Sequence, residues 1–166
     1  MKTVALTSAI LLIPAYASAE ISVNFIEGAP KDRFVLTNSG DCSLDTAKIT
    51  LDLSTSASGV IFDVTESGAG VEVFQPFEVV SGGAFIRSDP SVADGDRAVT
   101  IELENLPAGE SFSFSVDVDD TSGGREITVT DSELAGSSVS VQTAMWTASA
   151  TFKDNANASV RMPSCS

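Results

Sequence analysis

The chain consists of short runs in which apolar and polar residues alternate, each ended by residues that favour turns. The clearest run covers residues 111–118, where Phe112, Phe114, Val116 and Val118 are separated by serines and an aspartate. A period of two places these apolar side chains on one face of a β-strand. The glycines at 123–124 predict a turn and residues 127–129 resume the alternation. The stretch 111–130 is therefore predicted to form a β-hairpin at the centre of the fold.

Similar runs recur along the rest of the chain, with a kink expected at Pro76 and a short helical turn at 132–134. They cover residues 21–25, 34–36, 49–53, 60–64, 71–80, 99–103, 139–141, 145–152 and 158–162. No stretch of helical periodicity is long enough for a normal helix. About ten short strands predict an all-β protein, a single antiparallel β-sandwich of immunoglobulin-like or jelly-roll-like type. Trp146 is expected to anchor the core or its rim.

The first 19 residues have the three parts of a secretory signal peptide. Lys2 supplies the positive start, residues 4–13 are apolar, and Ala17-Ser18-Ala19 matches the A-x-A cleavage pattern. We expect cleavage after Ala19, which makes residues 1–19 the signal peptide and residues 20–166 the β-sandwich domain. The mature domain is then secreted or periplasmic. The apolar run is too short to span a membrane and no second one follows, so no membrane insertion is expected.

The charge and the cysteines narrow the choice of partners and compartment. The chain has 23 acidic and 9 basic residues, a net charge of −14. This charge disfavours unassisted nucleic-acid binding and favours cations, basic partners or simple solubility. The two cysteines, Cys42 and Cys165, are expected to form one disulfide, as an isolated pair in an exported chain most often does.

Carboxylates are the candidate functional groups. Histidine is absent, the lysines lie in no activating motif, and the pattern singles out no pair of carboxylates. No catalytic residue is therefore assigned, and the protein is not expected to be an enzyme. Hard oxygen ligands suit calcium, and Asp117 and Asp119 project from the same face of a strand. The candidate metal ligands lie in two clusters, Asp117, Asp119 and Asp120, and Asp89, Asp94 and Asp96. The alternative is that these acids are solvated charges that discourage association of sheet edges.

Two resemblances support these expectations. The strand–LPAG–strand pattern at 99–116 resembles immunoglobulin-like extracellular modules of bacteria. Three segments resemble small secreted bacterial proteins labelled aggregation factor core, after the sponge adhesion proteoglycan. They read FIEGAPKDRF at 25–34, IFDVT leading to GVEVFQP at 61–76, and DVDDT leading to REITV at 117–129. The second resemblance implies an exported, calcium-dependent module for adhesion or self-association.

Three classes of function follow. The first is a secreted interaction module, stabilised by calcium, that binds a protein or glycan at the cell surface or a second copy of itself. The second is a structural or accessory subunit without a ligand, whose partner contacts an uncharged sheet edge. The third is a hydrolase with two converging carboxylates in a deep cleft.

Overall fold

A computed structural model of the protein describes residues 18–65, 75–122 and 128–162. These contain eleven strands, a short 3₁₀ turn (Gly83–Phe85) and one helical turn, α1 (Asp131–Leu134). The strands are β1 (Glu20–Ile26), β2 (Asp32–Asn38), β3 (Ala47–Asp52), β4 (Ile61–Phe62), β5 (Glu78–Ser81), β6 (Ala98–Leu103), β7 (Ser111–Val116), β8 (Val118–Asp119), β9 (Ser138–Gln142), β10 (Thr147–Thr151) and β11 (Asn157–Arg161).

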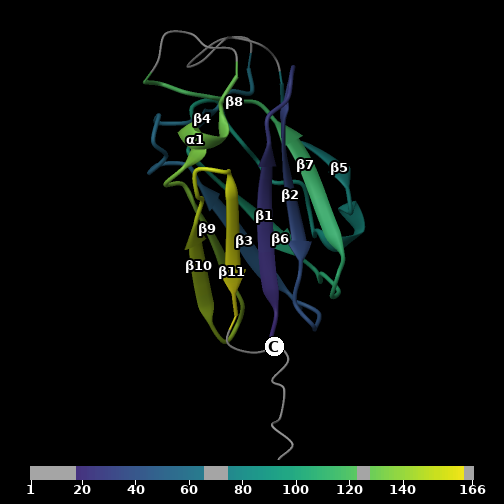
Figure 1. The fold of residues 1–166 in the computed structure, drawn as a ribbon. Helices are drawn as coiled ribbons and strands as arrows, with labels where there is room; N and C mark the ends of the chain where they lie inside the picture. The colour runs from purple at the N-terminus through teal and green to yellow at the C-terminus, as the bar shows by residue number, and fades with distance from the viewer. Residues whose placement is uncertain (1–17, 66–74, 123–127, 163–166) are drawn as a thin grey trace, which may run out of the picture.

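The strands form two facing sheets with antiparallel pairing throughout (Figure 1). The first sheet has the order β11-β1-β2-β7-β5, and the second has the order β10-β9-β3-β6. The short pair β4-β8 forms a separate ladder at one end. The predicted all-β sandwich is therefore confirmed, with eleven described strands against about ten expected.

Alternation along the strands decides which side chains form the core. Phe112, Phe114 and Val116 on β7 are buried, as the period of two predicts. The ring of Phe114 stacks between two others, with centroids 5.3 Å from Phe34 on β2 and 4.5 Å from Phe77 before β5. These contacts join three neighbouring segments of the first sheet through one aromatic stack.

The predicted central hairpin is wrong in the described residues. β7 pairs with β2 on one side and with β5 on the other, so neither of its edges is left for residues 127–129. After Asp117 the chain changes partner, and β8 pairs with β4. Residues 128–130 are not a strand, and residues 123–127 lie outside the described ranges. Two long-range pairings replace the local one that the sequence suggests.

Most other predicted elements are present. The helical turn α1 and the closing strands β9, β10 and β11 lie where they were expected. Trp146 is half-buried and packs against the core, as predicted for an anchor at the rim. Of the predicted run 71–80, the last part is β5, while residues 71–74 lie outside the described ranges.

Ser18 and Ala19, which precede β1, are hydrogen-bonded to neighbouring parts of the fold. The N–H of Asp41 donates to the carbonyl of Ser18 at 2.9 Å, and the N–H of Met162 donates to that of Ala19 at 3.1 Å. Ala19 is buried, and residues 1–17 lie outside the described part. None of the described helices is long and apolar enough to cross a membrane.

Candidate functional site: a buried acidic end of the sandwich

Four aspartates gather at the end of the sandwich where β2 begins. Asp32 is the first residue of β2, Asp63 follows β4, Asp117 follows β7, and Asp119 lies in β8. The exposed fractions of these residues are only 2%, 1%, 9% and 3% respectively. Burial of so many carboxylates is uncommon, because a charged side chain in a low-dielectric environment loses its hydration.

Main-chain pairing brings these residues together. Asp32 is opposite Val116 in the β2–β7 ladder, so it lies beside the point where the chain leaves β7. The N–H of Asp63 donates to the carbonyl of Asp117 at 3.1 Å. Asp119 is opposite Ile61 in the β4–β8 ladder. The short β4–β8 pair therefore carries Asp63 and Asp119 to the end of the first sheet.

The carboxylate of Asp32 is held by two main-chain donors. The N–H of Gly28 donates to Oδ1 at 3.0 Å, and the N–H of Val118 donates to Oδ2 at 3.3 Å. These bonds favour the ionised form of Asp32, but burial opposes it more strongly. Burial, together with the negative charges of Glu27 and Asp119, raises the pKa of Asp32 to about 7.

The pKa of Asp117 is also raised, for partly different reasons. Burial raises the pKa of Asp117 to about 7 and is the largest cause. The neighbouring negative charges of Asp119, Asp32 and Asp63, in that order, raise this pKa further. Three other carboxylates therefore act electrostatically on Asp117.

Two of these aspartates, Asp32 and Asp117, take no part in the ion pairs among the described residues. These ion pairs join Lys31 to Glu78, Lys48 to Glu102, Arg87 to Glu104, and Arg161 to Glu20. Neither Asp32 nor Asp117 therefore has a basic side chain of the described part as its ion-pair partner. At neutral pH their charge favours the binding of a proton or a cation.

The second predicted acidic cluster lies beside the first. The N–H of Phe62 donates to the carbonyl of Asp96, and the N–H of Gly95 donates to the carbonyl of Phe62, both at 2.9 Å. The N–H of Val64 donates to Oδ1 of Asp94 at 3.3 Å. The loop around Asp94 therefore borders the segment that carries Asp63, and the two clusters that the sequence treats separately share one end of the sandwich.

Three of the six predicted ligands are placed differently from the buried group. Asp120 accepts the N–H of Ser122 at 3.0 Å, and Asp96 accepts the N–H of Ala93 at 2.8 Å, so both carboxylates stabilise their own turns. Asp89 is exposed on its loop. Asp117 and Asp119 are both buried, so they are not the solvated charges of the alternative interpretation.

Sequence reasoning missed Asp32 and Asp63. Asp63 interrupts the apolar run 60–64, and an acid inside such a run is a signal that could have been followed. Asp32 lies between Lys31 and Arg33, which suggests an ordinary surface charge. Its burial depends on pairing with β7, which no local pattern reveals.

The side chains as they stand do not form a closed metal site. Among the described residues, no group of three or more acidic or cysteine side chains converges closely enough to hold a metal ion. A cation at this end would require the carboxylates to rotate towards it. Such rotation is chemically reasonable, because calcium accepts flexible geometry and takes main-chain carbonyls and water among its ligands.

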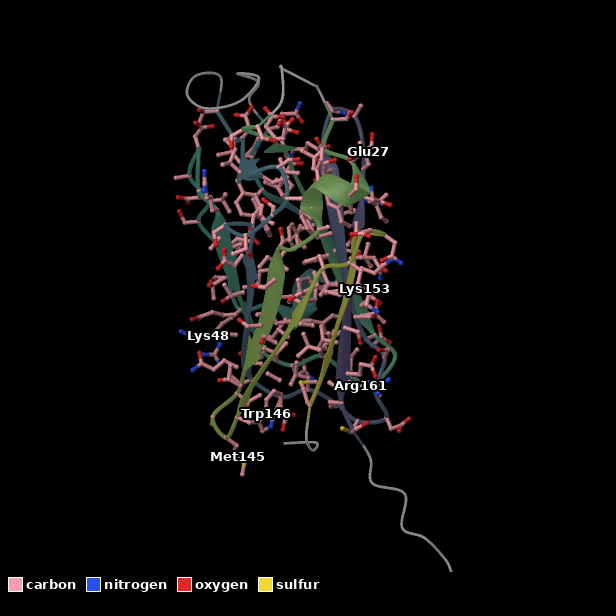
Figure 2. All side chains as sticks on the ribbon, turned by 60° about the vertical axis from the view of Figure 1, so that its left-hand side comes forward. Glu27, Lys48, Met145, Trp146, Lys153 and Arg161 are labelled. Carbon is pink, nitrogen blue, oxygen red and sulfur yellow. The ribbon has the colours of Figure 1, made fainter. Side chains whose placement is uncertain are left out.

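The opposite end of the molecule carries a pocket of about 370 Å³. Figure 2 shows Met145 and Trp146 at that end, far from Glu27 at the acidic end. The pocket is lined by Thr46, Ala47, Lys48, Gln142, Thr143 and Ala144. None of these residues is acidic, so this pocket is not the carboxylate-lined cleft of the hydrolase hypothesis.

Of the two cysteines of the predicted disulfide, only Cys42 lies in the described residues. This residue is partly buried, packs against the core and is not a free cysteine. Its carbonyl accepts a hydrogen bond from the Asn38 side chain at 2.8 Å. Cys165 lies outside the described ranges, so its pairing with Cys42 stays a prediction.

Comparison with known proteins adds no functional residue to this site. No family model matches the chain, and no curated protein and no solved structure is similar enough to count as a match.

Proposed function

We propose that the protein is an exported interaction module whose acidic end binds calcium and which acts in adhesion or self-association at the cell surface. Its partner is a protein or glycan, or a second copy of the chain. The observation that carries the proposal is the burial of Asp32 and Asp117 beside Asp63 and Asp119. Carboxylates in this environment are destabilised by their mutual repulsion, and a divalent cation relieves that repulsion.

Calcium is the cation that fits the chemistry of this end. The available ligands are carboxylate and carbonyl oxygens, and the sequence contains no histidine that would favour a transition metal. Magnesium demands a smaller and more regular arrangement of ligands, which a loop-rich end is less suited to supply. Binding would lock the loop around Asp94 and the β4–β8 pair to the first sheet.

Binding without catalysis is the form of activity that we propose. The carboxylates are buried in the end of the sandwich, where a substrate would not reach them. A structural subunit without a ligand is the second candidate, because β10 is an edge strand without a charged residue.

The test is the melting temperature of the purified exported protein in EDTA, in calcium and in magnesium. We expect calcium to raise it by several degrees, since a ligand at about 100 times its Kd adds ~2.7 kcal/mol. The double variant Asp117→Asn with Asp119→Asn should lose this rise. Asp154→Asn, which removes an exposed charge from the β10–β11 turn, is the matched control and should keep it. A calcium response of equal size in the double variant, or none in the wild type, would contradict the proposal.

A further inference from the structure

The outer edge of β10 is open. At the turn before β10, the N–H of Thr143 donates to the carbonyl of Trp146 at 2.9 Å. Hydrogen-bonded pairs alternate along an antiparallel ladder, so the even-numbered residues of β10 bond to β9 and the odd-numbered ones direct their N–H and C=O groups outwards. Among the described residues these outward groups have no main-chain hydrogen bond, and all three side chains are exposed. They belong to Thr147, Ser149 and Thr151.

β11 does not cover this edge, although it lies close to β10 (Figure 1). It contacts β9 as well as β10. Strands within one sheet are about 4.8 Å apart, so a strand placed beyond β10 would be about 10 Å from β9 and out of contact. β11 therefore lies over the inner face of β9 and β10. Ala148, Ala150 and Ala158 have small side chains that permit this close approach.

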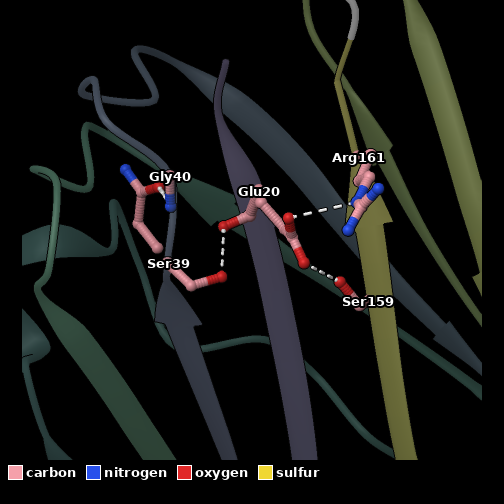
Figure 3. Close-up of polar contacts among 6 residues, drawn as sticks. Glu20, Ser39, Gly40, Ser159 and Arg161 are labelled. Atoms are coloured by element: carbon pink, nitrogen blue, oxygen red, sulfur yellow. Dashed lines mark hydrogen bonds and ion pairs between the residues drawn. The ribbon is translucent and has the colours of Figure 1, made fainter. Parts of the chain in front are cut away.

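The other sheet edges carry features that discourage pairing. On β11, Arg161 is bound to Glu20 of β1, as Figure 3 shows, and places a charge at the edge. β5 is four residues long, has a bulge, and carries Glu78 in an ion pair with Lys31. The N–H of Arg87 donates to the outer edge of β6. Short length, bulges and charges are the usual protections of edge strands, and β10 has none of its own.

The sequence of β10 is palindromic: it reads the same in both directions. It reads Thr-Ala-Ser-Ala-Thr, centred on Ser149. In an antiparallel pair of two such strands, every residue meets an identical one, with hydroxyl residues on the outer face and alanines on the inner face. A two-fold symmetric interface requires such self-complementarity.

The charge distribution also favours a second copy at this place. The whole chain carries a net charge of −14, which opposes association elsewhere. Residues 135–162 contain one acid, Asp154, and two basic residues, Lys153 and Arg161. This segment includes β9, β10 and β11, so its own charges add little repulsion between two copies that meet at β10.

We infer that β10 of one copy pairs with β10 of a second copy, antiparallel and centred on Ser149. Ser149 then faces Ser149 of the second copy, and Thr147 faces Thr151 of the second copy. The outward N–H and C=O groups of all three residues exchange hydrogen bonds with the second copy. The β10-β9-β3-β6 sheets of the two copies then form one continuous sheet. The inference deepens the proposed function, from which it takes only that the module self-associates, and it requires no calcium.

The test is sedimentation of the purified exported protein over a range of concentrations, in EDTA and in calcium, at physiological ionic strength. The Debye length of about 8 Å then screens the net charge at longer range and leaves two directly facing charges able to interact. We expect the wild type to form a dimer in both conditions. Ser149→Lys places two positive charges opposite each other and should weaken the dimer about tenfold or more. Asn155→Lys adds the same charge in the exposed turn after β10 and should leave the dimer unchanged. A mixture of Ser149→Lys and Ser149→Glu chains should restore a mixed dimer.

Each contrary result is decisive. A wild type that stays monomeric at every concentration overturns the inference, and so does a dimer that Ser149→Lys leaves intact. A dimer that needs calcium and ignores the substitution at Ser149 would support the proposed function while overturning the β10 interface. A calcium-independent dimer that the lysine weakens, without any calcium effect on the melting temperature, would support the interface while overturning the calcium site.

Discussion

The carboxylate of Asp32 accepts a hydrogen bond at 3.3 Å from the main-chain N–H of Val118, which lies 86 residues further along the chain. This bond ties the start of β2 to the start of β8 at the acidic end. It partly compensates for the burial of the charge, yet the pKa of Asp32 remains about 7 because the loss of hydration is the larger effect. The end of the sandwich is therefore sensitive to protons.

The pH dependence of stability follows from the raised pKa values. The carboxyls of Asp32 and Asp117 have a pKa of about 7 in the folded protein, against an ordinary value of 3.8. The folded state binds their protons more tightly, so their contribution to stability is full below about pH 4 and is lost as the pH rises to about 7. In EDTA, we expect the free energy of unfolding, measured by urea denaturation, to fall between about pH 4 and about pH 7.

Removal of one of the two titrating carboxyls tests whether they cause this pH dependence. Asp117→Asn should make the fall smaller, because the amide does not ionise. Asp154→Asn, in an exposed turn, should leave the fall as it is in the wild type. An equal fall in the Asp117→Asn variant would show that other groups cause the pH dependence.

The N-terminus of the exported protein is a second prediction. Cleavage after Ala19 would remove Ser18 and Ala19, whose carbonyls accept hydrogen bonds from Asp41 and Met162. Ala15-Tyr16-Ala17 also matches the A-x-A pattern, and cleavage after Ala17 would keep both bonds. These bonds favour a mature chain that begins at Ser18, two residues before the start at Glu20 that the sequence pattern predicts, and we expect this earlier start.

Intact mass and stability measurements test this boundary. The mass of the exported protein identifies its first residue directly. In addition, a fragment of residues 18–166 should be more stable than one of residues 20–166 by about 1–3 kcal/mol, since each hydrogen bond contributes about 0.5–1.5 kcal/mol. A mature chain that starts at Glu20, with equal stability of the two fragments, would refute the prediction.

Gly82 gives a third prediction, because it approaches β7 closely. Its φ is +71°, and a Cβ added there would lie 2.6 Å from the Cβ of Phe112 and 2.6 Å from the carbonyl oxygen of Ser111. Gly109 has a similar φ of +77°, with no atom within 4 Å of an added Cβ. Gly109→Ala should cost about 1–2 kcal/mol for the left-handed backbone alone. Gly82→Ala should cost about 3 kcal/mol or more, because steric overlap adds to the backbone cost.

Urea denaturation of the two alanine variants measures this difference. Both have the same change in side chain and nearly the same φ, so the difference between them isolates the close approach to β7. Equal losses of stability would mean that β7 and the segment at Gly82 move apart without cost.

Part of this fold could be predicted from local sequence. Alternation along residues 111–118 predicts the buried face of β7 because successive side chains of a strand point to opposite faces, whatever the strand pairs with. The same reasoning identifies β3, β6 and the closing strands. It fails for the central hairpin, since pairing depends on which edges remain free, and β2 and β5 occupy both edges of β7.

The candidate site depends on tertiary structure to a greater degree. The class of fold, the excess of acids and the two stretches in which acids are dense can be read from the chain alone. The grouping of Asp32 and Asp63 with Asp117 and Asp119, and the position of β10 at an edge, become visible in the folded protein. Burial and strand order arise from contacts between residues distant in the chain, and no local pattern encodes those contacts. The period of a strand specifies which of its faces is apolar, but it does not specify which strands pair with it.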